Sequence, residues 1–421
     1  MSDSHTGENL AFSLKSTIAE WELERHGKGP TITTDNASNI VCGVKEANLS
    51  PHILCFAHTI NLATQRGLHI SQTDRLLGKS RKIVFFFHRS TTASAILKNN
   101  QAKLELPQHK LIMDVQTRWN SSYDMLERYT EQQAAIFSTL LNKAVKKNLR
   151  DLVTLSDGDV ENVETLIQVL KPLKTVSKLM YNERNPTVSL IHPLKETLLK
   201  QLEVLPGDNA LVSAVKTAII NDLRPRYTGP NILKYLHQCS ALDPRFRSLP
   251  FLKENERHEI FHTLALHAAT LDSSQVVVKS EPSKDDSETL TNTTETPALP
   301  VLDPSLAVTD GATAQPKDAD LDEPVEKKNK CALDELFGDV FVTSVEPPKS
   351  IYDRLEVEVQ NYKAETVPSL DSSPLQWWRL REEKYPLLSK SVRQSLCVPA
   401  TSVASERVFS TAGDIVKGAS R

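Results

Sequence analysis

The chain has 421 residues, a formal net charge of −3 and a hydrophobic content of 39%, which indicate a soluble globular protein of two or three domains. Its longest conspicuous apolar run, Ile83 to Phe87, is too short to span a bilayer, so we expect no membrane partner. The five cysteines are scattered and form no CxxC pair. This pattern excludes a self-contained zinc finger and indicates reduced thiols in the cytosol or the nucleus.

In chain order, the first predicted element is an amphipathic helix over His5 to Leu23. A short β-type run follows at Thr31 to Thr34. Asp35 stands at its carboxyl end, where α/β folds often place functional side chains. The next segment, Pro51 to Arg66, is predicted to be helical because its proline suits the first turn of a helix.

The pattern from there to about residue 270 is mostly helical, with clear examples at 123–141, 160–180, 190–202 and 256–271. The last part of the chain begins at Ile351. There we expect a helix to about Ala364, a second helix from Pro374 to Leu388 and a further segment from Ser391 to Leu396.

Residues 272–330 differ in composition from the rest of the chain. They contain 13 acidic and 6 basic side chains, a balance of −7, so the remainder has a charge of +4 (−3 minus −7). They also contain six prolines and no aromatic residue. Such a segment buries too little apolar area to offset its chain entropy, so we predict a disordered acidic linker.

Lys279 lies in this linker, in the sequence Val278-Lys279-Ser280-Glu281. The spacing matches the apolar-Lys-x-Glu pattern of SUMO attachment, so SUMO is a candidate partner. A chance match to so short a pattern is the alternative.

Near the end of the chain, Pro399 to Gly413 is predicted to begin a helix, with hydroxyl residues available as caps and Glu406 among apolar neighbours. A carboxylate in such a place needs a partner, a metal ion or water. If the fold brings Asp35 close to Glu406, the two resemble part of a set that holds two divalent ions. The alternative for Asp35 is that it only caps the helix that follows it.

Four motifs place these residues in a wider pattern: Thr34-Asp35-Asn36-Ala37-Ser38-Asn39, Cys55-Phe-Ala-His58, Thr117-Arg118-Trp119-Asn120-Ser121 and Ser405-Glu406-Arg407-Val408-Phe409-Ser410. Together they resemble a hAT-superfamily transposase and, more narrowly, the zinc-finger BED-type proteins derived from one. The resemblance implies a mostly α fold with a small α/β part, in which a large all-helical insertion interrupts a partial ribonuclease-H-like core. It also implies that Asp35 and Glu406 correspond to the second and third catalytic carboxylates.

The resemblance further predicts the domain order. It runs as a partial ribonuclease-H-like core (1–66), a helical insertion domain (67–271), the disordered acidic linker (272–330), a short docking segment (331–350) and a hAT C-terminal dimerisation region that completes the core (351–421). The expected dimerisation residues, as interface or core, are Trp377, Trp378, Leu387 and Phe409.

The family's first catalytic Asp and its BED zinc finger would precede the helix that begins at His5, and we expect this chain to be N-terminally truncated relative to the family. Two carboxylates of three do not hold two metal ions well. We therefore expect a vestigial nuclease site and no enzyme activity. We also expect no cofactor, with Mg²⁺ relevant only to a longer form that has the complete set.

Several residues are candidates for contact with DNA. The resemblance suggests that Arg118 meets a phosphate and that the Trp119 indole stacks on an unpaired base, although a core Trp that caps a helix is the alternative. Lys82 and Arg89 flank the Phe85–Phe87 run and could meet phosphates, or form a solvated helix face. Cys55 and His58 lack further ligands for zinc, so we expect a structural pair.

The sequence therefore predicts a non-catalytic dimerising protein derived from a hAT transposase, nuclear and associated with DNA or transcription regulation. Its expected partners are a second copy, DNA and SUMO. The alternative is a fragment of an active magnesium-dependent transposase that cleaves DNA and transfers strands.

Overall fold

The computed structural model describes residues 4–24, 29–147, 154–182, 187–276 and 350–419. The predicted acidic linker lies outside these ranges except for residues 272–276, which continue the helix that ends at Val276. The predicted docking segment lies outside them apart from Ser350, and so does Lys279.

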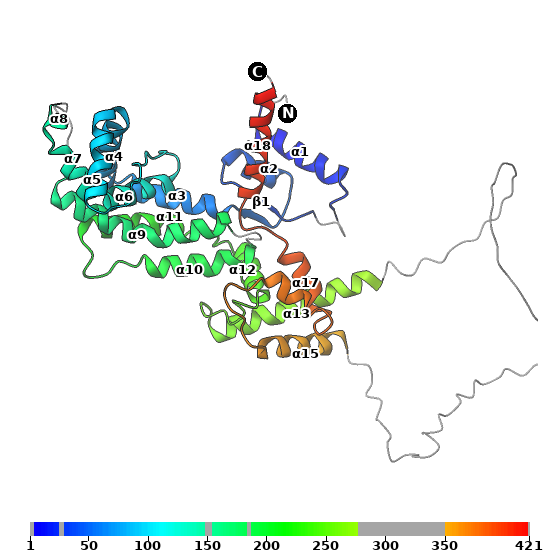
Figure 1. Ribbon diagram of the computed structural model, residues 1–421. Helices are drawn as coiled ribbons and strands as arrows, with labels where there is room; N and C mark the ends of the chain where they lie inside the picture. Colours follow the sequence, from blue (N-terminus) through cyan, green and yellow to red (C-terminus); the bar gives the residue numbers. More distant parts are fainter. Residues whose placement is uncertain (1–3, 25–28, 148–153, 183–186, 277–349, 420–421) are drawn as a thin grey trace, which may run out of the picture. The chain divides into compact units, whose positions relative to one another are not determined.

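The described residues are mostly helical, as predicted (Figure 1). The helices before residue 150 are α1 (Gly7–Glu20), α2 (Ser38–Glu46), α3 (Phe56–Leu68), α4 (Ser71–Arg89), α5 (Thr91–Lys103), α6 (Trp119–Glu131), α7 (Gln133–Leu140) and α8 (Lys143–Lys146). The later helices are α9 (Asp157–Asn182), the short 3-10 helix η1 (Val188–Leu190), α10 (Ile191–Gln201), α11 (Ala210–Leu223), α12 (Pro230–Leu242), α13 (Glu254–Val276), α15 (Ile351–Ala364), α16 (Pro374–Arg379), α17 (Leu388–Ser395) and α18 (Val403–Ala419).

A small parallel sheet is the only sheet among the described residues. Strand β1 (Ile32–Thr34) pairs with β2 (His52–Leu54), and Ile32 lies opposite His52. The predicted helix over 51–66 is therefore wrong at its start. Ile53 is fully buried, and pairing with β1 outweighs the local preference of Pro51 for a first helical turn, so the helix begins only at Phe56.

The helical body has one continuous apolar core. Helices α9, α10 and α11 lie against one another, and α3 packs on both α9 and α11 (Figure 1). Phe56 and Ile60 of α3, Trp119 and Leu126 of α6, and Leu170 of α9 are all at most 1% exposed. Burial of such large side chains supplies the main stabilisation of these helices.

A second apolar core joins the last part of the chain to the end of the helical body. It contains Leu264 of α13, Tyr362 of α15 and both tryptophans of α16. The predicted helix from Pro374 to Leu388 is wrong, because α16 ends at Arg379 and α17 begins only at Leu388. Pro386 lies between them, and proline inside a helix removes a hydrogen bond and clashes with the preceding turn.

Among the described residues, we find no helix that combines the length and the apolar content needed to span a bilayer.

Candidate functional site

The segment just before α18 docks on the carboxyl ends of both strands. The Thr33 hydroxyl of β1 donates to the Pro399 carbonyl oxygen at 2.8 Å. The Phe56 N–H, at the start of α3, donates to the Ala400 carbonyl oxygen at 2.9 Å. The structure therefore brings together the two segments that contain the predicted carboxylates.

Cys55 anchors the beginning of α18. Its sulfur is 3.3 Å from the Thr401 hydroxyl oxygen and accepts the Ser402 N–H at 3.3 Å, and the residue is 1% exposed. His58 is half-buried on the first turn of α3. Among the described residues it makes no comparable contact with the 401–402 segment, so the structure gives this anchoring contact to Cys55 alone.

The two predicted carboxylates make local contacts. Asp35 Oδ1 accepts the Ala37 N–H at 3.2 Å, which forms an Asx turn just before α2. Ala37 is the N-cap residue of α2 and no side chain caps it, so the capping role given above as the alternative is not confirmed. Glu406 Oε1 accepts the Ser402 hydroxyl at 2.6 Å, and the Glu406 side chain is exposed rather than buried among apolar neighbours. Within the described part of the chain, no three His, Cys, Asp or Glu side chains are grouped so as to hold a metal ion. The described residues thus do not fit a two-magnesium site.

Arg118, Tyr181 and Arg407 form a junction surface where α6, α9 and α18 approach one another. The Arg407 guanidinium donates to the Tyr181 carbonyl oxygen at 3.0 Å, and its carbon lies 5.9 Å from the centre of the Tyr181 ring. Burial raises the pKa of the Tyr181 hydroxyl. The nearby charges of Cys55 and Glu406 raise it further, whereas those of Arg118 and Arg407 oppose the shift. Arg118 and Glu406 therefore each lie near enough to the Tyr181 hydroxyl to act on its pKa.

Trp119 does not belong to this surface. It is 1% exposed and its ring packs edge to face on Tyr123. It is the first residue of α6, and its backbone N–H donates to Asn61 Oδ1 at 3.4 Å. This burial contradicts the predicted stacking on an unpaired base, because no face of the indole is free. Arg118, immediately before it, is exposed and remains available to a phosphate.

A second basic surface lies on α4. Lys82, Phe85 and Arg89 are exposed and follow the spacing of one helix face. The Arg89 guanidinium carbon is 5.3 Å from the centre of the Phe85 ring. We call Lys82, Phe85 and Arg89 the α4 surface; an exposed aromatic ring beside two cations is an arrangement that suits nucleic acid.

Three of the four predicted dimerisation residues are part of the chain's own core. Trp377 is 8% exposed, Trp378 3% and Leu387 3%. The Trp378 indole N–H donates to the Leu242 carbonyl oxygen at 2.7 Å, which ties α16 to the end of α12. Of the two predicted places, interface or core, these three residues take the core, because the chain itself covers them. Phe409 is 74% exposed and remains a candidate.

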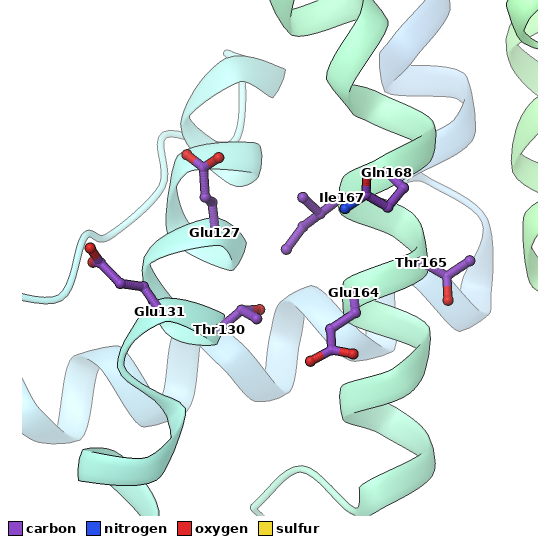
Figure 2. A pocket seen from close by; sticks show the side chains of 7 residues that line it. All are labelled: Glu127, Thr130, Glu131, Glu164, Thr165, Ile167 and Gln168. Atoms are coloured by element: carbon purple, nitrogen blue, oxygen red, sulfur yellow. The ribbon is translucent and has the colours of Figure 1, made fainter. Parts of the chain in front are cut away.

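A hollow of about 610 Å³ lies between α6 and α9 and is acidic (Figure 2). Glu127 and Glu131 of α6 line it together with Glu164 of α9. Figure 2 shows these glutamates on the two facing helices, with Ile167 between them. Three carboxylates repel phosphate, so this hollow does not suit nucleic acid.

Sequence reasoning missed two residues of the junction surface. Arg407 directly follows Glu406, so its place was visible, but its contact with α9 was not. Tyr181 is the penultimate residue of α9 and has no motif around it. Its role depends on a contact with Arg407, which is 226 residues away in the sequence.

Comparison with known proteins agrees with this arrangement. Residues 358–419 match the family model described as the hAT family C-terminal dimerisation region, and residues 53–169 match the ZBED1 RNase-like helical domain. The chain is thus a relative of hAT transposases and of the zinc-finger BED proteins, as the motifs predicted.

Individual relatives cover nearly the whole chain. Zinc finger BED domain-containing protein 4 of Homo sapiens is 27% identical over 97% of this chain and 31% of its own length. A Talaromyces stipitatus protein provisionally named transcriptional regulator tpeD is 23% identical over 99% of the chain and 46% of its own length. A Zea mays protein provisionally named AC transposase is 24% identical over 98% and 48%. The chain therefore spans about a third to a half of these relatives.

Proposed function

We propose that this chain is a non-catalytic, self-associating protein of hAT-transposase ancestry that acts in the nucleus in association with DNA. The match of residues 358–419 to a dimerisation region supports self-association most directly. Within that region Leu380 and Phe409 are each 74% exposed, and Val408 is 68% exposed. Large apolar side chains left in water within a matched dimerisation region are candidates for contact with a second copy.

The contacts of the two ancestral carboxylates support a non-catalytic role. Asp35 accepts the Ala37 N–H in the turn before α2, and Glu406 accepts the hydroxyl of Ser402, the residue just before α18. The alternative, a fragment of an active magnesium-dependent transposase, draws on the name of the Zea mays relative. It needs a third metal-binding side chain beside these two, and the described residues do not contain one.

Association with DNA is supported by two basic surfaces, the junction surface and the α4 surface, each with an aromatic ring beside arginine. A role in transcription is supported by the name of the Talaromyces stipitatus relative. A nuclear location follows from both proposals.

Sedimentation of the full chain across a dilution series tests self-association. We expect a concentration-dependent shift from monomer to dimer; a single monomeric species at every concentration would contradict the proposal.

A plasmid-nicking assay with Mg²⁺ tests the non-catalytic role, and we expect no cleavage. Nicking that disappears in Glu406→Gln would establish the alternative. Imaging a tagged chain in cells tests the location, and exclusion from the nucleus would refute it.

A further inference from the structure

A groove of about 230 Å³ lies between α13 and α15, and each helix lines it with one stripe of side chains. The stripe from α15 contains Tyr352, Glu356, Val359, Gln360 and Lys363. The stripe from α13 contains His258, Phe261, His262, Ala265 and Leu266. These spacings of three and four residues place each set on one face of its helix.

The groove has a buried apolar floor and an exposed apolar rim. Phe261 and Val359 are each 6% exposed, whereas Leu266 is 42% and Tyr352 53% exposed. Two parallel stripes with apolar side chains left in water between them have the shape that receives a third helix.

Two opposite charges on α15 indicate which helix can occupy the groove. Glu356 and Lys363 are seven residues apart, so they lie two turns apart on the same face, and both are exposed. Among the described residues neither has an ion-pair partner; the Lys363 ammonium lies 5.3 Å from the centre of the Phe261 ring. The midpoint of the two charges falls between Val359 and Gln360.

This charge pattern is complementary to itself. A second α15, laid antiparallel about that midpoint, places its Lys363 opposite Glu356 and its Glu356 opposite Lys363. A two-fold symmetric dimer requires such a reciprocal arrangement, in which the same patch meets itself. The groove is also continuous with the matched dimerisation region, because Val359, Gln360 and Lys363 lie within residues 358–419.

We propose that α15 of a second copy lies antiparallel in the groove between α13 and α15, so that two copies form a four-helix contact flanked by two Glu356–Lys363 ion pairs. The inference rests on the proposed self-association and names its surface. The apolar stripes supply the contact, and the ion pairs set direction and register.

Charge reversal in the full chain tests this arrangement by sedimentation. Glu356→Lys places two lysine pairs across the contact and Lys363→Glu places two glutamate pairs. We expect each variant to weaken the dimer about tenfold or more, because like charges held together at an interface are costly. The double variant Glu356→Lys/Lys363→Glu restores opposite charges and is expected to dimerise within about threefold of the unchanged chain. An equimolar mixture of the two single variants is expected to form mixed dimers.

Lys178→Glu is the matched control, since Lys178 is exposed on α9. It is expected to leave the dimer unchanged, and thermal unfolding checks that every variant is folded. If the unchanged chain is monomeric, the proposed function fails together with this inference. If the chain dimerises and both single variants dimerise equally well, another surface joins the copies and this inference alone is overturned. Failure of the double variant to recover overturns the antiparallel register.

Discussion

The Thr33 hydroxyl and the Pro399 carbonyl oxygen are joined by a hydrogen bond of 2.8 Å across 366 positions of sequence. This bond ties β1 to the segment that leads into α18. The described residues of the ranges 1–273 and 351–421 belong to one compact unit, in which the matched dimerisation region is bound to the rest of the fold. We therefore expect the proposed self-association to depend on the integrity of the sheet and of the contacts around it.

The first prediction concerns the anchor of α18. Cys55→Ala removes the sulfur that accepts the Ser402 N–H and contacts the Thr401 hydroxyl. We expect a loss of about 1–2 kcal/mol in the free energy of unfolding, since the part-buried Ser402 N–H loses its acceptor. Urea denaturation measures it. Cys42→Ala is the control because Cys42 is exposed, and an equal loss in both variants would refute the anchoring role.

The second prediction concerns the buried carboxylate of Asp243. It is 0% exposed and accepts two guanidinium N–H groups of Arg245, at 3.0 and 2.8 Å, as well as the Ser189 hydroxyl at 2.7 Å. Asp243→Ala is expected to cost about 3–5 kcal/mol of stability, because it breaks a buried ion pair by removing the carboxylate that accepts two guanidinium N–H groups.

The exposed Arg393–Glu382 pair is the natural comparison for Asp243. Glu382→Ala is expected to cost at most about 1 kcal/mol, because solvent screens that pair. Chemical denaturation of both variants measures the loss in the free energy of unfolding. Similar losses would show that burial does not make the Asp243–Arg245 pair more stabilising than the exposed pair.

The third prediction is a pH dependence caused by His192. Burial, with the neighbouring His237 and Lys195, lowers the pKa of His192 to about 3, and the two imidazole rings are 4.3 Å apart. Because the unfolded pKa of histidine is near 6.5, the unfolded chain binds this proton first as the pH falls. Stability is therefore fully present above about pH 6.5 and is lost as the pH falls toward 3, by up to about 1.4 kcal/mol per unit.

His192→Leu removes this titration. Urea denaturation at pH 7 and pH 5 is expected to show a smaller loss of stability on acidification in the variant than in the unchanged chain. His69→Gln is the control, since His69 is exposed. Identical acid losses in the unchanged chain and in His192→Leu would remove His192 as their source.

The fourth prediction separates two adjacent residues. Trp119→Ala is expected to destabilise the fold by about 3–5 kcal/mol, because a fully buried indole leaves a cavity. Arg118→Ala is expected to change stability by no more than about 0.5 kcal/mol, since Arg118 is exposed. If the junction surface binds DNA, Arg118→Ala also lowers affinity and reduces the salt dependence of binding by about one phosphate contact. Unchanged binding across a salt titration would exclude Arg118 from the interface.

The fifth prediction concerns Phe409. Phe409→Asp puts a charge on an apolar side chain that is 74% exposed within the dimerisation region, and we expect about tenfold weaker self-association. Phe137→Asp is the matched control, because Phe137 is 66% exposed on α7, outside that region. Sedimentation of both variants is the measurement, and a dimer that tolerates aspartate at 409 would place Phe409 outside the contact.

Local pattern was enough to predict much of the fold. The period of apolar residues over 160–180 predicted α9, which runs from Asp157 to Asn182, and β-branched residues predicted β1 at Ile32–Thr34. The predicted linker begins at residue 272, whereas α13 continues to Val276, so the change in composition precedes the end of the helix. These features depend on neighbours in sequence, so the sequence alone reveals them.

Contacts between distant residues decided the rest. His52–Leu54 forms a strand because β1 lies beside it. The sequence predicted that Trp377 and Trp378 are interface or core residues. Only the fold shows that other helices of the same chain bury them. The sequence by itself determined the ancestry and the helical elements, since motifs and periodicity are local. Only the tertiary structure decided which side chains meet: Arg407 with Tyr181, Cys55 with Ser402, and the exposed stripes of α13 and α15 along one groove. The physical reason is that burial depends on what lies opposite a side chain, and that partner is set by chain folding over long separations.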